Sequence, residues 1–182
     1  MLFNLFGKKE KEDENRLFKD IVWMSEEAKF DALAKAYVAD PSILFIAWFP
    51  ATVKAFRAFI SKAGIDEQKV MEARFVHSNQ VSGQQVLFIE HYPLHEKELA
   101  LVQSLQLQKA IVYSSLDEPL FKQMGSDKVI PMMKMMGMKA NEAIEHPLVA
   151  KSVVSAQEKI AAKVTVEMAA ESQGEWVERN LK

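Results

Sequence analysis

Cysteine is absent from this chain of 182 residues, which excludes disulfide bridges, thiolate metal sites and cysteine nucleophiles. Long apolar runs are also absent, since none approaches the roughly 18 residues that a membrane-spanning helix needs. Glycine is scarce, with 6 residues, and no G-x-x-x-x-G-K-[ST] sequence occurs. The chain therefore lacks the phosphate loop with which many nucleotide hydrolases cradle their substrate.

A strong excess of one charge is missing as well. The 23 basic and 25 acidic residues give a formal net charge of −2, so no overall field attracts nucleic acid or anionic lipid. The remaining composition, 49% hydrophobic and 26% charged, is that of a globular protein with a real core. The apolar patch at the start, MLFNLF, is too short for a secretory signal. We expect a cytoplasmic protein with a flexible tail over residues 1–18.

Strands and helices alternate in the first two thirds of the chain. Ser25 is a candidate N-cap for the first helix, Pro50 opens the second, and Pro93 and Leu94 open the third. Strands that alternate with helices favour right-handed βαβ units on a parallel sheet. The sequence therefore predicts a three-layer α/β domain with a mostly parallel sheet over residues 19–115. Its strands are expected at Asp20–Met24, Ile43–Phe49, Val70–Val76, Val86–Ile89 and Ala110–Tyr113.

A helical extension is predicted over residues 116–182. Two short helices, Asp117–Met124 and Ser126–Met136, are each followed or ended by a glycine, and Pro147 opens a longer helix. That helix is expected to continue to about Gln173, with a frayed end from Gly174. The methionines of the second short helix raise a separate question. Val129, Met132 and Met136 share one helical face, which predicts core packing more than an adaptable binding surface.

The run from Ser114 to Ile160 resembles SecA, the bacterial preprotein-translocase ATPase family, at the exit from its second nucleotide-binding domain into its helical scaffold. Weaker resemblance extends over Asp20–Ser172, through segments such as DIVWMSEEAKFDAL and VLFIEHYPLHEKELALVQ. The residues that carry the stronger match are Leu116-Asp117, Leu120-Phe121, Ser126-Asp127-Lys128-Val129, Met132-Met133, Gly137-Met138, Glu142 to Pro147, Ala156-Gln157 and Lys159.

This resemblance implies a RecA-like fold whose ATPase chemistry has been lost. The family's second motor domain supplies arginine fingers from a Q-x-R-G-R-x-G-R run, which neutralise charge on the transferred phosphoryl group. On that run Gln103 takes the place of the glutamine, and the arginines fall on Leu105, Leu107 and Ala110. A single lysine, Lys109, cannot offer the bidentate fork of an arginine. We expect no ATP hydrolysis and no cofactor, and we expect these leucines to be buried.

The carboxyl ends of the predicted strands form a second candidate site, because ligands of open α/β sheets bind at this edge. Residues there could hold a nucleotide or another small anion, or could simply form a polar loop. A metal site is not predicted, since Pro93 separates the two histidines of H-Y-P-L-H and keeps them off one helical face. The candidate ligand-binding residues are His77, Glu90, His91, His95, Ser114 and Ser115.

Two functions remain after these exclusions. The first is a non-catalytic interaction or regulatory module, whose partner is SecA, another Sec component or a second copy of the chain. The second is a small-ligand or nucleotide-binding protein that uses the strand-end crevice. A hydrolase has only Glu90, His91 and His95 to work with and no nucleophile beside them.

Overall fold

A computed structural model describes residues 17–181. One five-stranded, all-parallel sheet runs through its centre, in the order β1-β5-β4-β2-β3. This confirms the predicted α/β fold with a parallel sheet. The prediction for the tail lies outside the described residues except at its end, where Phe18 already belongs to a strand. The strands are β1 (Phe18–Trp23), β2 (Leu44–Ala47), β3 (Val70–Glu72), β4 (Val86–Phe88) and β5 (Ala110–Ser115).

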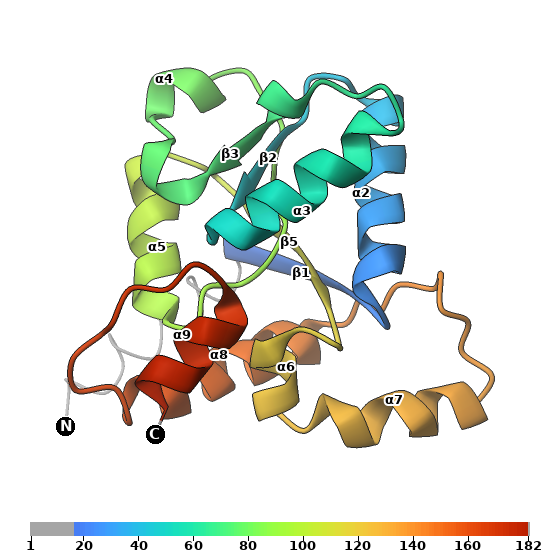
Figure 1. The fold of residues 1–182 in the computed structure, drawn as a ribbon, viewed down its shortest axis with the longest axis vertical. Coiled ribbons are helices and arrows are strands. Elements are labelled where there is room, and N and C mark those ends of the chain that lie inside the picture. The colour runs from blue at the N-terminus through green and yellow to red at the C-terminus, as the bar shows by residue number, and fades with distance from the viewer. Residues whose placement is uncertain (1–16, 182) are drawn as a thin grey trace, which may run out of the picture.

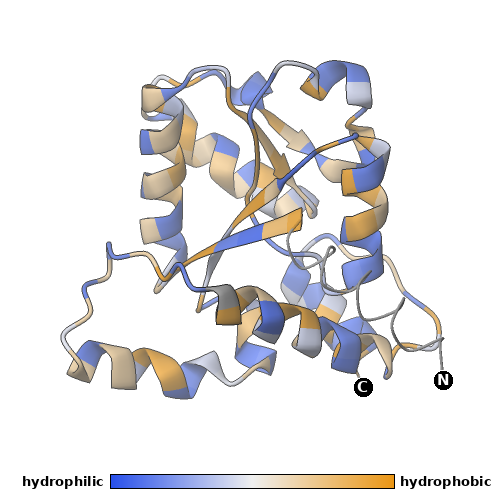
Figure 2. Cartoon of the chain, turned by 180° about the vertical axis from the view of Figure 1, so that it is seen from behind, coloured by the Kyte–Doolittle hydropathy of each residue, from blue (hydrophilic) through white to orange (hydrophobic). Residues whose placement is uncertain are grey.

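Helices cover both faces of the sheet (Figure 1). Helices α2 (Glu26–Ala39) and α3 (Pro50–Ser61) pack on one face, around buried Phe45 and Leu87. Helices α4 (Ser78–Val81) and α5 (His95–Ser104) pack on the other, around strand residues with the opposite orientation, such as Leu44 and Ile46. Both faces of the sheet therefore pack against apolar residues, which is typical of parallel sheets, and the strands in Figure 2 are mostly orange.

The predicted starts of the first two helices are confirmed, and the third helix, α5, begins at His95, directly after Leu94. The Ser25 hydroxyl accepts a hydrogen bond from the Ala28 amide, so it caps α2, and Pro50 occupies the first position of α3. Strands β2, β3 and β4 are shorter than the sequence predicts, and the largest difference is in β3, which ends at Glu72. The chain then forms a short 3₁₀ helix (Ala73–Phe75) followed by α4, and these two elements place Val76 and Val81 in the core.

Four further helices lie at the carboxyl end of the strands (Figure 1). The predicted end of the long helix that begins at Pro147 is wrong, because the helix ends at Ala161 and not near Gln173. The residues predicted to fray instead form a final helix, in which Trp176 is completely buried. Its N-cap is Ser172, whose hydroxyl accepts from the Glu175 amide. The four helices are α6 (Pro119–Gln123), α7 (Ser126–Met135), α8 (Pro147–Ala161) and α9 (Gln173–Asn180).

The connection between α7 and α8 covers part of the free edge of β1. Val22 donates to the Ile144 carbonyl at 3.1 Å, and the Ile144 amide donates to the Val22 carbonyl at 2.8 Å. A covered edge strand is protected from pairing with other chains. Within residues 17–181, no helix has the length and apolar character that crossing a membrane requires.

Helix α7 turns a different face to the solvent than the sequence predicts. Met132 and Met136 are 55% and 81% exposed, so their predicted core packing is wrong. Met133 is the methionine that packs inward, against a cluster that includes Phe121 and Val153. The reason is the angle at which α7 docks on α6 and α8, which spacing along the chain does not determine.

Candidate functional site

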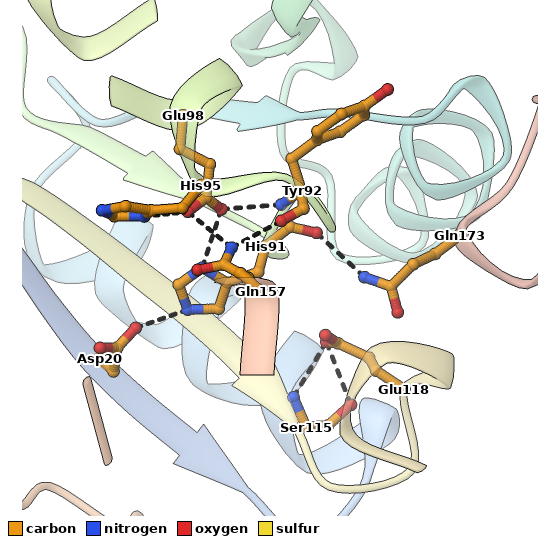
Figure 3. A network of polar contacts seen from close by, with 9 residues as sticks. All are labelled: Asp20, His91, Tyr92, His95, Glu98, Ser115, Glu118, Gln157 and Gln173. Carbon is orange, nitrogen blue, oxygen red and sulfur yellow. Dashed lines mark hydrogen bonds and ion pairs between the residues drawn. The ribbon is translucent and has the colours of Figure 1, made fainter. Parts of the chain in front are cut away.

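A cluster of buried polar side chains lies at the carboxyl ends of β4 and β5 (Figure 3). Glu90 and His91 lie two and three residues after the end of β4, and Ser114 and Ser115 end β5. The exposed fractions of Glu90 and His91 are 3% and 2%, and the two serines are completely buried. This edge is where the ligands of parallel sheets bind. In this protein the cluster at that edge is enclosed. The hydrogen-bond and ion-pair partners of each side chain therefore determine whether it is free to bind a ligand or to react.

His91 lies between two buried carboxylates. Its Nε2 is 2.5 Å from Asp20 Oδ1 on β1, and its Nδ1 is 2.8 Å from Glu98 Oε1 on α5. Burial by itself lowers the pKa of His91, but the charges of Glu98 and Asp20 outweigh burial and raise it well above the ordinary value. Both nitrogens therefore carry protons and donate. Neither has a lone pair for a metal or for accepting a substrate proton.

Glu98 connects this histidine to the rest of the cluster. It accepts hydrogen bonds from the Tyr92 amide at 2.7 Å and from Gln157 Nε2 at 2.9 Å, and His95 Nδ1 is 3.4 Å away. Burial disfavours the charge of Glu98, but His91 and the hydrogen bonds lower its pKa to about 2. A charged carboxylate is thus fixed in the interior by a full set of donors.

A second buried ion pair lies beside the first. Lys29 of α2 contacts Glu118 with Nζ–Oε1 at 2.6 Å, and the two side chains are 1% and 7% exposed. The same oxygen accepts from the amide of Ser115 at 2.9 Å and from its hydroxyl at 3.3 Å. Burial raises the pKa of Glu118 although Lys29 acts in the opposite direction. This pair joins α2 to the loop after β5.

Glu90 caps the helix that follows the neighbouring strand. The N-cap residue of α3 is Phe49, whose side chain cannot accept a hydrogen bond. Glu90 Oε1 accepts from the amides of Trp48 and Phe49, each at 3.0 Å, and its Oε2 accepts from the Thr52 hydroxyl at 2.8 Å. Burial raises the pKa of Glu90 to about 7. The carboxyl group thus satisfies amides at a helix start, where partial positive charge favours it.

Two glutamines from the C-terminal helices close the edge. Gln157 of α8 is fully buried and donates to the Tyr92 carbonyl at 2.6 Å as well as to Glu98. Gln173 of α9 donates to the His91 carbonyl at 3.0 Å and accepts from the Leu120 amide at 2.8 Å. An apolar layer lies alongside them, made of Phe49, Leu94, Leu120, Ile160 and Trp176.

The structure brings together five of the six predicted ligand-binding residues: Glu90, His91, His95, Ser114 and Ser115. His77 is not with them, because β3 ends early and His77 is exposed at the start of α4. Within residues 17–181 no group of three or more histidine or acidic side chains could hold a metal ion. The residues that sequence reasoning missed are Asp20, Lys29, Glu98, Glu118, Gln157 and Gln173.

The positions aligned with the family's arginine fingers lie at the far end of α5 from this cluster, about 15 Å along the helix. Leu105 is 4% exposed and belongs to the core, and Leu107 packs against that core. Ala110 is fully buried at the start of β5, while Gln103 is exposed. The predicted burial of the two leucines is confirmed for Leu105 and is partial for Leu107.

An open hollow of about 710 Å³ lies beside the cluster, where β2, β3 and β4 end. Trp48 and Tyr92 contribute aromatic surface to it. Its cations are already paired: Arg74 with Glu72, Lys97 with Glu167 and Arg179 with Glu175. A phosphate group would have to displace these carboxylates.

No family model matches the chain. Part of it is similar to SecA. Over 51 residues it is 49% identical to the protein translocase subunit SecA of Acidithiobacillus ferrooxidans, and over 48 residues it is 46% identical to that of Buchnera aphidicola. The SecA of Acinetobacter baumannii is 43% identical over 51 residues. These segments cover 26–28% of this chain and 6% of each SecA. The chain is thus related to SecA over about a quarter of its length.

Proposed function

We propose that this chain is a non-catalytic relative of the SecA motor that acts as an interaction or regulatory module in Sec protein translocation. The observation that carries the proposal is the enclosed polar cluster at the carboxyl ends of β4 and β5. Its histidine and its carboxylates are engaged by neighbouring groups, since His91 is the centre of an ion-pair network and Glu90 caps a helix.

The leucines at the arginine-finger positions support the same proposal. A transferred phosphoryl group needs cations that approach it, and removing such fingers slows related hydrolases by about 10³–10⁵-fold. Leu105 is part of the hydrophobic core, so an arginine at that place would have to be buried without a partner. Together with the missing phosphate loop, this favours a role in binding over one in catalysis.

Two measurements test the proposal. Purified chain, cross-linked in an extract of its host and analysed by mass spectrometry, is expected to capture SecA or another Sec component. Capture of no Sec component contradicts the proposed role. ATP turnover, measured as released phosphate, is expected to equal that of a buffer blank. Turnover that persists through repurification and co-elutes with the folded chain contradicts the non-catalytic part.

The hollow beside the cluster is the basis of a second candidate function, the binding of a small ligand. Its position at the ends of three parallel strands favours this function, and its aromatic lining suits a planar ligand. Thermal-shift screening with nucleotides tests it, since a ligand at 100 times its Kd adds about 2.7 kcal/mol of stability. Absence of a shift for every nucleotide removes nucleotides as ligands.

A further inference from the structure

A groove runs between α7 and α8, and its floor reaches Val22 of β1. Its apolar part is a hollow of about 300 Å³, to which Val129 and Met133 contribute from α7 and Val149 from α8. Its second part is a hollow of about 520 Å³ along α8. Met124, Leu148 and Ser152 line both hollows, so the two adjoin each other.

The charges of this groove have one sign. Lys151, Lys159 and Lys163 line the second hollow, and no carboxylate lines either one. None of these lysines has an ion-pair partner in the described part of the chain. Lys151 and Lys159 lie about 12 Å apart along α8, and Lys163 follows the end of that helix. This local excess of positive charge contrasts with the formal net charge of −2 for the whole chain.

Large apolar side chains are exposed in and beside the groove. Leu148 is 61% exposed although it lines both hollows, and Met132 and Met136 are 55% and 81% exposed on the adjoining helix. Figure 2 shows hydrophobic bands along α7. Methionine is flexible and polarizable and is common on surfaces that bind helices. Exposed groups of this size, beside a concave apolar surface, mark an interaction site.

We propose that this groove binds an acidic amphipathic helix of a protein partner. The apolar face of such a helix fills the hollow between α7 and α8, and its carboxylates pair with Lys151 and Lys159 of α8 and with Lys163 just beyond it. The concave shape fits a helix better than it fits a flat lipid surface. This inference rests on the proposed function, because it specifies how the module recognises its partner.

The direct test uses a fluorescein-labelled peptide of about three heptads, with leucine at positions a and d and glutamate elsewhere. Fluorescence anisotropy is expected to show saturable binding to the full chain. Leu148→Asp is expected to weaken it at least about tenfold, and so is the triple change of Lys151, Lys159 and Lys163 to glutamate. Val38→Asp, at a residue that is 74% exposed on α2, and Lys35→Glu on the same helix are matched controls without effect.

Methyl NMR of methionine locates the bound peptide. The signals of Met124 and Met133, which line the groove, are expected to shift on titration, whereas that of Met71 on β3 stays in place. A peptide that shifts Met71 as much as Met133 binds elsewhere and overturns the proposal. Equal binding by a peptide with lysine in place of glutamate overturns it as well.

Three other occupants give distinct results, each of which contradicts the proposal. A concentration-dependent dimer in sedimentation, abolished by Leu148→Asp, assigns the groove to a second copy. Altered Met133 signals after deletion of residues 1–16 assign it to the chain's own N-terminal segment. Binding to anionic vesicles, lost in the triple lysine variant, assigns it to lipid. If the wild-type chain captures a Sec component and Leu148→Asp captures it equally, the groove proposal fails while the proposed function stands.

Discussion

Trp176 offers the sharpest test of how the C-terminal helices hold the sheet edge. Its side chain is completely buried against Phe49, Leu120 and Ile160, and its indole N–H donates to Glu167 at 2.9 Å. A buried tryptophan removes about 150–250 Å² from water, which is worth about 4–6 kcal/mol at 25 cal/mol per Å². Trp176→Ala leaves a cavity that the surroundings fill only in part. We expect a loss of about 3–5 kcal/mol in the free energy of unfolding.

Urea unfolding measures this loss. With a slope of about 2 kcal/mol per M, the midpoint is expected to fall by about 1.5–2.5 M. Trp176→Phe keeps most of the apolar contact and is expected to recover more than half of the difference. Val166→Ala serves as the control in the same segment, since Val166 is 77% exposed, and it is expected to change stability by less than about 0.5 kcal/mol.

Hydrogen exchange separates two ways in which the variant could respond. If α9 detaches while the sheet stays folded, the amides of residues 173–180 lose protection and the loss is limited to the docking energy of that helix. The reasoning is refuted if the free energy of unfolding of Trp176→Ala lies within about 0.5 kcal/mol of the wild-type value and the α9 amides of the variant exchange as slowly as those of the wild type.

Three further outcomes concern the buried charges, each measured by urea unfolding. The pKa of Glu98 is lowered to about 2, so its contribution to stability is present above the unfolded value and is lost as pH falls through 2. Glu98→Gln is expected to remove this loss of stability at low pH, whereas Glu96→Gln, at an exposed residue, is expected to leave it unchanged. The pKa of Glu90 is raised to about 7, so wild-type stability falls as pH rises from about 4.5 to 7, and Glu90→Gln is expected to remove that fall. Lys29→Met and Glu118→Gln are each expected to cost about 3–5 kcal/mol, and the double variant less than their sum; additive losses would show that the pair is not coupled.

The sheet and its helices were predictable because local signals agree with the fold. Short apolar runs gave all five strands, and Ser25 and Pro50 mark helix starts in the ordinary way. The final helix differs from the frayed end that is predicted from Gly174. The sequence holds a signal for it: Ser172 and Glu175 have the spacing of a capping box. The β-branched run Val164-Thr165-Val166 likewise disfavours a continuous helix there.

The candidate site was predictable only where strand ends determine it. Glu90, His91, Ser114 and Ser115 follow from the rule that parallel strands end at one edge. The side chains that bond to them come from β1, α2, α5, α8 and α9. No local sequence pattern predicts that these five elements meet at one place. Lys29 gives one clue, because it lies one helical turn before fully buried Leu33. A lysine on an apolar stripe needs a buried partner, but the sequence does not name Glu118 as that partner.

The register of the sheet has a consequence for how the chain folds during synthesis. The first strand pairs with the last, Phe18 opposite Ala110, across about ninety residues of intervening chain, and contacts at this range slow folding. At about 5–20 residues per second, a ribosome needs roughly 5–18 s to make β5 after β1. For that time the apolar segment IVW has no neighbouring strand to pair with. The nascent chain therefore passes through a stage in which its first strand is itself an exposed binding sequence.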